Sequence, residues 1–408
     1  MKLSLRNIML AAAVVAVAAP AIAAETVTVK TDWYKTYTTN RNESRFGAGF
    51  GGKVYFNDKK NGKVMTIDKD GTVEEYAAVE GLGTGIAIDD AGNVLVNTGF
   101  PGPASATNFV IISAEDKSQT KLTLDINKDN SGFDAARVDQ LGRVAGNLLS
   151  EDGAFFFMAM FSTEEKPINK TTTVFVQNGE QAMGDLAYLM SDACPSAMGS
   201  STCVQPLYDF ETLVGMGDDV RKAGFAVRAR GDQRVRYYVI EGEGGDWVAL
   251  AKPNNGHNTS GTEGFDIFKI GDKYYTINPV VMTKNHENAF EIADEDGNVI
   301  FNSVTDGGVP VACETGGQSF GSYNARPVYN EAGEVEKVEI YQWYGANNNN
   351  CLAAMFTVSN TQGVNDVIAA DADVAPVYYN LQGVRVANPA NGLYIKVVGE
   401  KASKVLVK

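Results

Sequence analysis

The sequence has few histidines and cysteines and a shortage of positive charge. Its 408 residues include only two histidines and four cysteines. Its 35 lysines and arginines are outnumbered by 50 aspartates and glutamates, which gives a formal net charge of −15. A nucleic-acid-binding protein needs a basic face to replace phosphate counterions, so we expect no nucleic-acid partner. Two histidines also argue against a histidine-rich metal site.

Long apolar runs are missing everywhere except at the N-terminus. Lys2 and Arg6 precede an uninterrupted apolar run over residues 8–19, and small residues follow as far as Ala23 and Ala24. This pattern is typical of a secretory signal peptide, here residues 1–24, cleaved after Ala23 or Ala24. No later segment reaches the roughly 18 apolar residues of a membrane helix, so we expect no membrane span. The sequence therefore predicts an exported protein, extracellular or at the cell surface, with the periplasm as an alternative.

The four cysteines are Cys194, Cys203, Cys313 and Cys351. An even number in an exported chain indicates disulfides, although four cysteines allow three pairings. Pairing nearest neighbours in sequence favours Cys194–Cys203 and Cys313–Cys351. Their spacing does not match the paired C-x2-C pattern of a zinc site.

Short strands separated by tight turns make up most of the chain. Asn-Gly or Asp-Gly dipeptides, which supply the positive φ angles of two-residue hairpin turns, occur at positions 61, 70, 152, 178, 255, 296, 306 and 391. Alternating segments such as residues 63–67, 121–126 and 336–340 predict strands with one buried face. The stretch 210–223 is the one candidate for a short helix.

These strands are grouped in units with the length of a propeller blade. We place unit starts near Phe46, Gly85, Phe133, Gly184, Phe225, Phe265 and Ser322. Their spacing matches the roughly 40 to 50 residues of a four-stranded blade. The sequence therefore predicts an all-β fold, a β-propeller over residues 25–365 with seven blades. Six blades and a pair of β-sandwiches are the alternatives, and residues 26–37 have the character of a strand that completes the last blade.

One unit resembles the repeat of NHL-type propellers. Residues 85–96 read Gly-Ile-Ala-Ile-Asp-Asp-Ala-Gly-Asn-Val-Leu-Val, a strand that turns through Asp89 and Gly92 into a second apolar strand. Residues 137–144 and 291–300 look like degraded copies of it. The resemblance implies the propeller architecture and no particular activity.

The C-terminal segment resembles the sorting domains of the type IX secretion system of Bacteroidetes. Residues 377–386, 391–397 and 404–408 form strand-like segments, and Gly383, Gly392 and Tyr394 match the family pattern. The resemblance covers about 35 residues, roughly half of the family domain. It implies that residues 376–408 form a small β-module, joined through a linker at 366–375, that directs the chain to secretion machinery.

A calcium loop is one candidate site. Asp125, Asn127 and Asp129 place oxygen side chains at alternate positions, as calcium loops do. The EF-hand pattern wants glycine and glutamate where this sequence has Asn130 and Ala136, so a polar loop between strands is the competing interpretation.

Ligand recognition has four candidate side chains. Trp343, with Tyr344 beside it, could stack on a sugar ring, although propellers also bury such residues between blades. His257 lies in a polar stretch suited to the rim of a propeller, and His286 precedes Glu287. Neither histidine has an identifiable third partner for catalysis.

No catalytic serine motif and no phosphate-binding glycine loop occurs in the sequence. We therefore favour a non-enzymatic propeller that binds an extracellular glycan, peptide or protein. The alternatives are a secreted propeller hydrolase or lactonase that uses calcium and carboxylates, and a structural surface protein held by its tail.

Overall fold

The structure is a computed structural model, and it divides into two compact units, which are described separately. The first comprises residues 29–359, and the second contains residues 360–408 together with the first 28 residues. The described residues are 27–39, 43–125, 137–161, 169–189, 203–216, 225–228, 236–241, 244–249, 264–271, 273–282, 287–313, 320–331, 333–345, 351–360, 377–380, 385–386, 389–390, 392–398 and 401–407.

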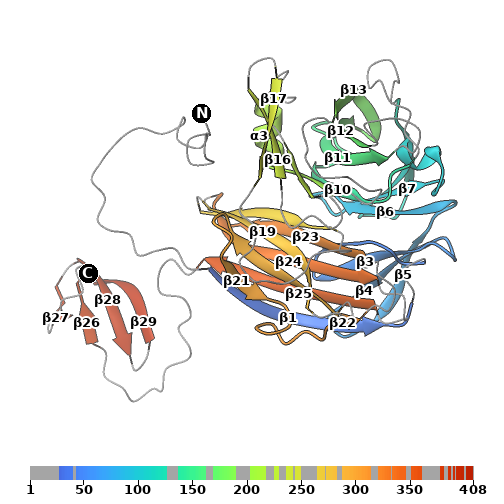
Figure 1. Cartoon of the computed structure of the whole chain (residues 1–408). Helices are drawn as coiled ribbons and strands as arrows, with labels where there is room; N and C mark the ends of the chain where they lie inside the picture. The colour runs from blue at the N-terminus through green and yellow to red at the C-terminus, as the bar shows by residue number, and fades with distance from the viewer. Residues whose placement is uncertain are drawn as a thin grey trace. The chain divides into compact units, whose positions relative to one another are not determined.

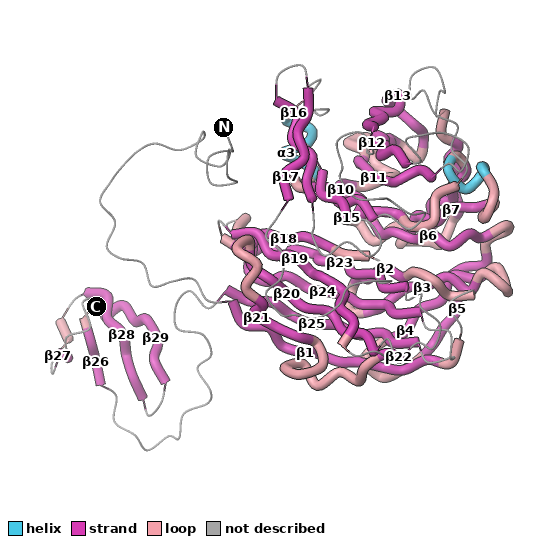
Figure 2. The backbone as a smooth tube through the Cα atoms, viewed as in Figure 1, coloured by secondary structure: helices cyan, strands magenta, loops and turns pink. Residues whose placement is uncertain are grey.

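The described residues of the first unit form six antiparallel sheets, and five of these are built around four strands that follow one another along the chain (Figures 1 and 2). Blades one to three are β2–β5 (Gly47–Phe50, Lys53–Asp58, Lys63–Ile67, Val73–Ala78), β6–β9 (Leu82–Ile88, Val94–Thr98, Asn108–Ile112, Gln119–Thr123) and β10–β13 (Leu141–Gly146, Ala154–Phe161, Asn169–Gln177, Glu180–Leu189). Blades four and five are β14–β17 (Cys203–Pro206, Phe225–Arg228, Arg236–Glu241, Gly244–Ala249) and β18–β21 (Asp266–Ile270, Lys273–Val281, Glu287–Asp294, Val299–Asn302), with β22 (Ala312–Cys313) paired to β20.

The sixth blade is closed by the N-terminal strand. It contains β23 (Phe320–Tyr329), β24 (Val335–Gly345) and β25 (Cys351–Asn360), and β1 (Val27–Tyr37) lies along β25 as the outermost strand. Figure 1 shows blue β1 beside orange β25 although they come from opposite ends of the sequence. Thr357 Oγ1 donates a hydrogen bond of 2.6 Å to Asp32 Oδ2 across this pair. The predicted strand at 26–37 therefore completes the last blade, as expected.

The innermost strands of the blades form a closed ring. β2 contacts β6, β6 contacts β10, β10 contacts β14, and β23 contacts both β18 and β2. Between blades four and five, Gln205 Nε2 donates to Phe265 O at 3.0 Å, and Arg228 Nη1 donates to Gly264 O at 3.0 Å. The predicted all-β propeller is confirmed, with six blades.

The preferred count of seven blades is wrong, because two predicted unit starts lie on either side of one innermost strand, β14, and neither of them begins it. Gly184 lies within β13, the outer strand of the third blade, and Phe225 begins β15, the second strand of the fourth. Both have the glycine or aromatic residue that marks a unit start, but the same residues also occur inside blades. The starts near Phe46, Phe265 and Ser322 lie within two residues of an innermost strand.

The hairpin dipeptides form turns where both of their residues are described, whereas those at 255 and 391 fall at least partly outside the described residues. Gly71, between β4 and β5, and Gly297, between β20 and β21, have φ values of 81° and 84°. In the turn between β6 and β7, Asp89 Oδ1 accepts hydrogen bonds from the backbone N–H groups of Ala91 at 3.0 Å and Asn93 at 2.8 Å. These turns fix the register of the strands that they join.

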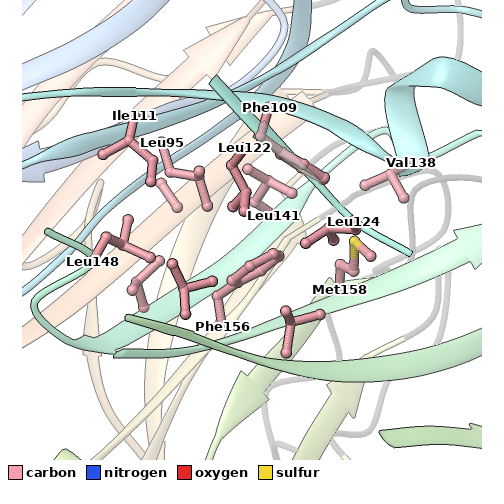
Figure 3. Packing of buried hydrophobic residues seen from close by; sticks show 14 of the residues in the cluster. Leu95, Phe109, Ile111, Leu122, Leu124, Val138, Leu141, Leu148, Phe156 and Met158 are labelled. Atoms are coloured by element: carbon pink, nitrogen blue, oxygen red, sulfur yellow. The ribbon is translucent and has the colours of Figure 1, made fainter. Parts of the chain in front are cut away.

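Apolar side chains fill the spaces between adjacent blades. Figure 3 shows the cluster between blades two and three, where Leu95, Phe109 and Leu122 point toward Leu141 and Phe156. Phe109 and Phe156 pack edge to face with their ring centroids 5.6 Å apart. Such interfaces bury both faces of each sheet and hold the ring of blades together.

Helix is scarce in the described residues. The short helix predicted within 210–223 is present as α3 (Phe210–Gly215), which begins with Thr212 N–H donating to Asp209 Oδ1 at 2.9 Å. A turn of 3-10 helix, η2 (Pro103–Ala106), lies between β7 and β8. No helix among the described residues is long and apolar enough to cross a membrane.

The C-terminal unit contains a separate four-stranded sheet, in the order β27–β26–β28–β29. Its strands are β26 (Val377–Tyr379), β27 (Arg385–Val386), β28 (Gly392–Val398) and β29 (Lys401–Val407). Within it, Gly392 pairs with Val407 and Tyr394 with Val405.

Candidate functional site

The propeller has two faces, which the strand directions distinguish. We call the starting face the one at which every innermost strand begins. Because the blades are antiparallel, the connection from the preceding blade and the turn between the second and third strands also lie at this face. The opposite face carries the turns between the first and second and between the third and fourth strands.

A group of charged and aromatic residues gathers at the starting face, and we call it the basic cluster. It comes from four blades: one residue precedes β2, one follows β3, one lies between β7 and β8, two precede β10, and one begins β23. Its members are Arg45, Lys59, Phe100, Arg137, Asp139 and Phe320.

Asp139 lies between two guanidinium groups. Arg45 Nη1 donates to Asp139 Oδ2 at 3.3 Å, and Arg137 Nε lies 2.9 Å from Asp139 Oδ1. The Asp139 side chain is fully buried, whereas those of Arg45 and Arg137 retain 17% and 30% exposure. The two arginines therefore compensate a buried carboxylate and still reach solvent.

Phe100 is the ring on which three cations converge. The Arg45 and Arg137 guanidinium carbons lie 5.4 and 5.7 Å from its centroid, and Lys59 Nζ lies 5.2 Å away. Arg45 also lies over Phe320, 4.4 Å from the centroid. Cation–π contacts at these distances stabilise each positive charge by about 0.5–1 kcal/mol at exposed sites.

The pKa of Lys59 is lowered from its usual value. Burial is the largest cause, and repulsion from the Arg45 guanidinium adds to it, while attraction to Asp139 opposes both. The cluster therefore keeps two like charges close together at some electrostatic cost.

Hydrogen bonds to the second blade fix the segment that carries Arg137 and Asp139. Thr84 Oγ1 donates to Asp139 O at 2.9 Å, and Asn97 Nδ2 donates to Val138 O at 2.9 Å. The Val138 N–H donates in turn to Ser105 Oγ at 3.0 Å. These bonds hold the approach to β10 against the neighbouring blade.

The segment that carries Arg45 is anchored from the sixth blade. Trp343 Nε1 donates to the carbonyl oxygen of Ser44 at 3.1 Å, directly before Arg45. The Lys59 N–H donates to Glu43 O at 2.9 Å, which ties the turn after β3 to the same segment. The cluster is thus placed by backbone contacts and not only by its own charges.

Two arginines connect blades across the ring toward the opposite face. Arg326, on β23, donates through Nη1 to Ile88 O at 3.1 Å and through Nη2 to Asp89 O. Arg143, on β10, donates to Ala325 O at 3.0 Å and to Pro206 O at 3.2 Å. These bonds join blades two, three, four and six, so they serve the cohesion of the ring.

Asp266, at the start of β18, belongs to the same charged interior. Its two carboxylate oxygens accept hydrogen bonds of 2.7 Å from the N–H groups of Ile267 and Ala325. Burial raises the pKa of Asp266 to about 6, although the nearby Arg143 and Arg326 act in the other direction. We assign it the role of linking blades five and six.

The hypothesis that Trp343 and Tyr344 bind a sugar is wrong. Their exposed fractions are 1% and 2%, so neither ring offers a face to a ligand. The Trp343 indole is stacked on Phe56, with centroids 4.2 Å apart and planes 6° from parallel. Both residues lie on β24, where the long strand passes through the interior of the blade, and Trp343 acts by positioning Ser44.

Cys203 is a free thiol, so the predicted disulfide Cys194–Cys203 is not formed, whereas Cys313–Cys351 stays a prediction. Cys203 is a buried thiol on an innermost strand, with Sγ 3.9 Å from Phe265 O, and the Cys351 thiol donates to Thr39 O at 3.2 Å. Cys194 and the side chain of Cys313 lie outside the described residues.

The other predicted site residues fall mainly outside the described part of the chain. His257, His286, Asn127, Asp129 and Gly383 are among these. Asp125 is exposed after β9, and its N–H donates to Gln181 Oε1 at 2.8 Å. No three His, Cys, Asp or Glu side chains gather as possible metal ligands among the residues described above. The calcium hypothesis stays a prediction.

Sequence reasoning missed the basic cluster. Arg137 and Asp139 drew attention only as part of a degraded repeat, in which Asp139 would occupy a turn. Instead Asp139 lies two residues before β10, and Arg45 lies two residues before β2. The sequence did contain a signal for this cluster, because arginines lie directly before innermost strands in a chain whose net charge is −15.

Comparisons with known proteins concern the fold alone. The sequence matches no protein-family model and no curated protein. A DUF4623 family protein from Bacteroides eggerthii is similar in structure with a TM-score of 0.52 at 12% identity, over 82% of this chain and 78% of that chain. A gluconolactonase from Xanthomonas campestris (12% identity, TM-score 0.39, 82% and 90% covered) and a virginiamycin B lyase from Staphylococcus aureus (11%, 0.34, 82% and 99%) are more distant. At these scores the last two carry no argument about activity.

Proposed function

We propose that this chain is an exported β-propeller that binds an extracellular ligand at its starting face without transforming it. The observation that carries the proposal is the basic cluster, in which cations and aromatic rings from four blades meet beside a single buried carboxylate. Arginine and aromatic side chains supply most of the binding energy at recognition sites. The ligand classes that suit such a face are a glycan, a peptide or a protein.

One other candidate residue also lies at this face. Asp125 is exposed directly after β9, the fourth strand of the second blade, and the fourth strand of each blade ends at the starting face.

We further propose that residues 1–24 direct export and that the C-terminal sheet engages secretion machinery of the type IX kind. The supporting features are the signal-peptide pattern and the residues Gly383, Gly392 and Tyr394. Deleting residues 374–408 is expected to retain the protein in the periplasm of the producing cell. Cell fractionation and N-terminal sequencing measure this, and unchanged delivery to the cell surface contradicts the sorting role.

Binding is tested on the chain that begins at residue 25. Glycan and peptide arrays identify ligands, and hydrogen exchange with the ligand present locates its footprint. We expect protection at the segments before β2 and β10 and at the turn after β3. A ligand that protects only the opposite face contradicts the proposal. Hydrolysis of a lactone that requires calcium and is abolished by EDTA favours the lactonase alternative instead.

A further inference from the structure

Lys59 differs from every other lysine of the first blade. Lys53, Lys60, Lys63 and Lys69 each have a carboxylate oxygen 2.6–3.6 Å from Nζ. Lys59 is half-buried, and among the described residues no carboxylate oxygen lies within 4.0 Å of its Nζ, although Asp139 is near enough to attract it. Its Nζ instead faces the Phe100 ring at 5.2 Å, beside Arg45.

This arrangement is unusual in an acidic protein. The chain has 50 carboxylate side chains for 35 basic ones, so a carboxylate could easily have been placed beside Lys59. Keeping a half-buried ammonium near a guanidinium costs free energy that an anion would recover. Perturbed charges of this kind cluster at functional sites more often than elsewhere.

Resting on the ligand-binding role proposed above, we propose that Lys59 and Arg45 receive a carboxylate of the ligand at the starting face. The cluster already shows how it holds one carboxylate, because Asp139 lies against both Arg45 and Arg137. A ligand carboxylate would give Lys59 the one-to-one pairing that the other lysines of this blade have. Its carbon skeleton would then lie near the half-buried Phe100 ring.

The carboxylate could belong to a sugar acid or to the C-terminus of a peptide, which present the same group. Isothermal titration calorimetry with D-glucuronate and with acetyl-alanyl-alanine separates these sources. Each probe is paired with the amide that replaces only its carboxylate, D-glucuronamide for the sugar acid and acetyl-alanyl-alanine amide for the peptide. Inorganic phosphate and sulfate are titrated as competing anions.

Lys59→Met is the test variant, and Lys60→Met is its matched control. Lys60 is the next residue, it is 69% exposed, and Glu43 pairs with it at 3.6 Å. We expect at least one carboxylate probe to bind wild type, with about tenfold loss for its neutral form and for Lys59→Met, the size of one partly desolvated ion pair. Lys60→Met should bind within about twofold of wild type.

Several outcomes overturn the inference. One is that neither carboxylate probe binds wild type, and another is that the neutral probes bind as tightly as the carboxylates. The inference also fails if Lys59→Met binds the carboxylate with wild-type affinity, or if phosphate or sulfate binds wild type more tightly than the carboxylate does. Thermal unfolding of Lys59→Met is expected at or slightly above the wild-type temperature, because the substitution removes a half-buried charge that Arg45 repels. Where that variant is destabilised, Lys59→Gln, which keeps a polar end without charge, provides the same comparison.

The experiment also separates this inference from the proposed function. A neutral ligand that protects the starting face in hydrogen exchange, with no effect of Lys59→Met, refutes the carboxylate site and leaves the binding function standing. Absence of any ligand footprint at that face refutes both.

Discussion

Replacing Trp343 by phenylalanine tests whether this residue belongs to the interior or to a binding surface. The indole is 1% exposed, and its N–H donates to Ser44 O, in a residue that is itself fully buried. Phenylalanine leaves that carbonyl without this donor, at a cost of about 1–3 kcal/mol. Three fewer buried ring atoms cost about 2 kcal/mol more, and weakened stacking on Phe56 adds a few tenths.

The expected total is a loss of about 3–5 kcal/mol in the free energy of unfolding. Urea titration followed by far-ultraviolet circular dichroism measures it. Trp33→Phe is the control, because Trp33 lies half-buried on the outer strand β1 and should lose less than about 1 kcal/mol. A loss below about 0.5 kcal/mol in Trp343→Phe would refute burial as the role of this residue.

Three further predictions concern buried polar groups. Burial raises the pKa of the Cys203 thiol to about 12, so we expect Cys203 not to react with Ellman's reagent at pH 8 until the chain is unfolded; mass spectrometry that finds it in a disulfide contradicts this. Asp89→Asn should destabilise the chain by about 2–3 kcal/mol in a urea titration, since Asp89 is buried and accepts four hydrogen bonds. Asp294→Asn, in the matching exposed turn, should cost less than half as much. The pKa of Asp266 is about 6 in the folded chain and about 3.9 in the unfolded chain, so between these values the native state holds a proton that the unfolded state has lost. The free energy of unfolding should therefore fall by up to about 3 kcal/mol as pH rises from 4 to 6. Asp266→Asn should lose this dependence, and parallel plots of unfolding free energy against pH for variant and wild type would contradict the assignment.

Local sequence signals predicted the elements of this fold well. Residues 63–67 form β4 as their alternation indicates, and the segment 85–96 is the strand–turn–strand of the second blade. These features depend on neighbours within a few residues, so the chemistry that determines them is visible in the sequence. The number of blades could not be predicted from such local signals. An aromatic residue such as Phe225 can begin any strand of a blade, so it does not identify the innermost one.

The candidate site was beyond such reasoning. Arg45 and Asp139 are 94 positions apart, and their contact exists only because the ring brings blades one and three to the same axis. The burial of Trp343 has the same origin, since its partners Ser44 and Phe56 come from the opposite end of the chain. Nothing local distinguishes a tryptophan that will be covered by another blade from one that stays in solvent.

The pairing of β1 with β25 imposes an order of events on the chain. Thr357 and Asp32, which are hydrogen-bonded across it, are 325 positions apart, so the first strand to be made waits for nearly the last. Until β25 (residues 351–360) has been made, β1 has no partner in its sheet and presents unpaired edges, to which a strand of another molecule could add. Contacts of such long range are slow to form, and the sixth blade can be completed only after β25 has been made. Any process that has to handle the polypeptide in an extended state has that whole interval in which to act.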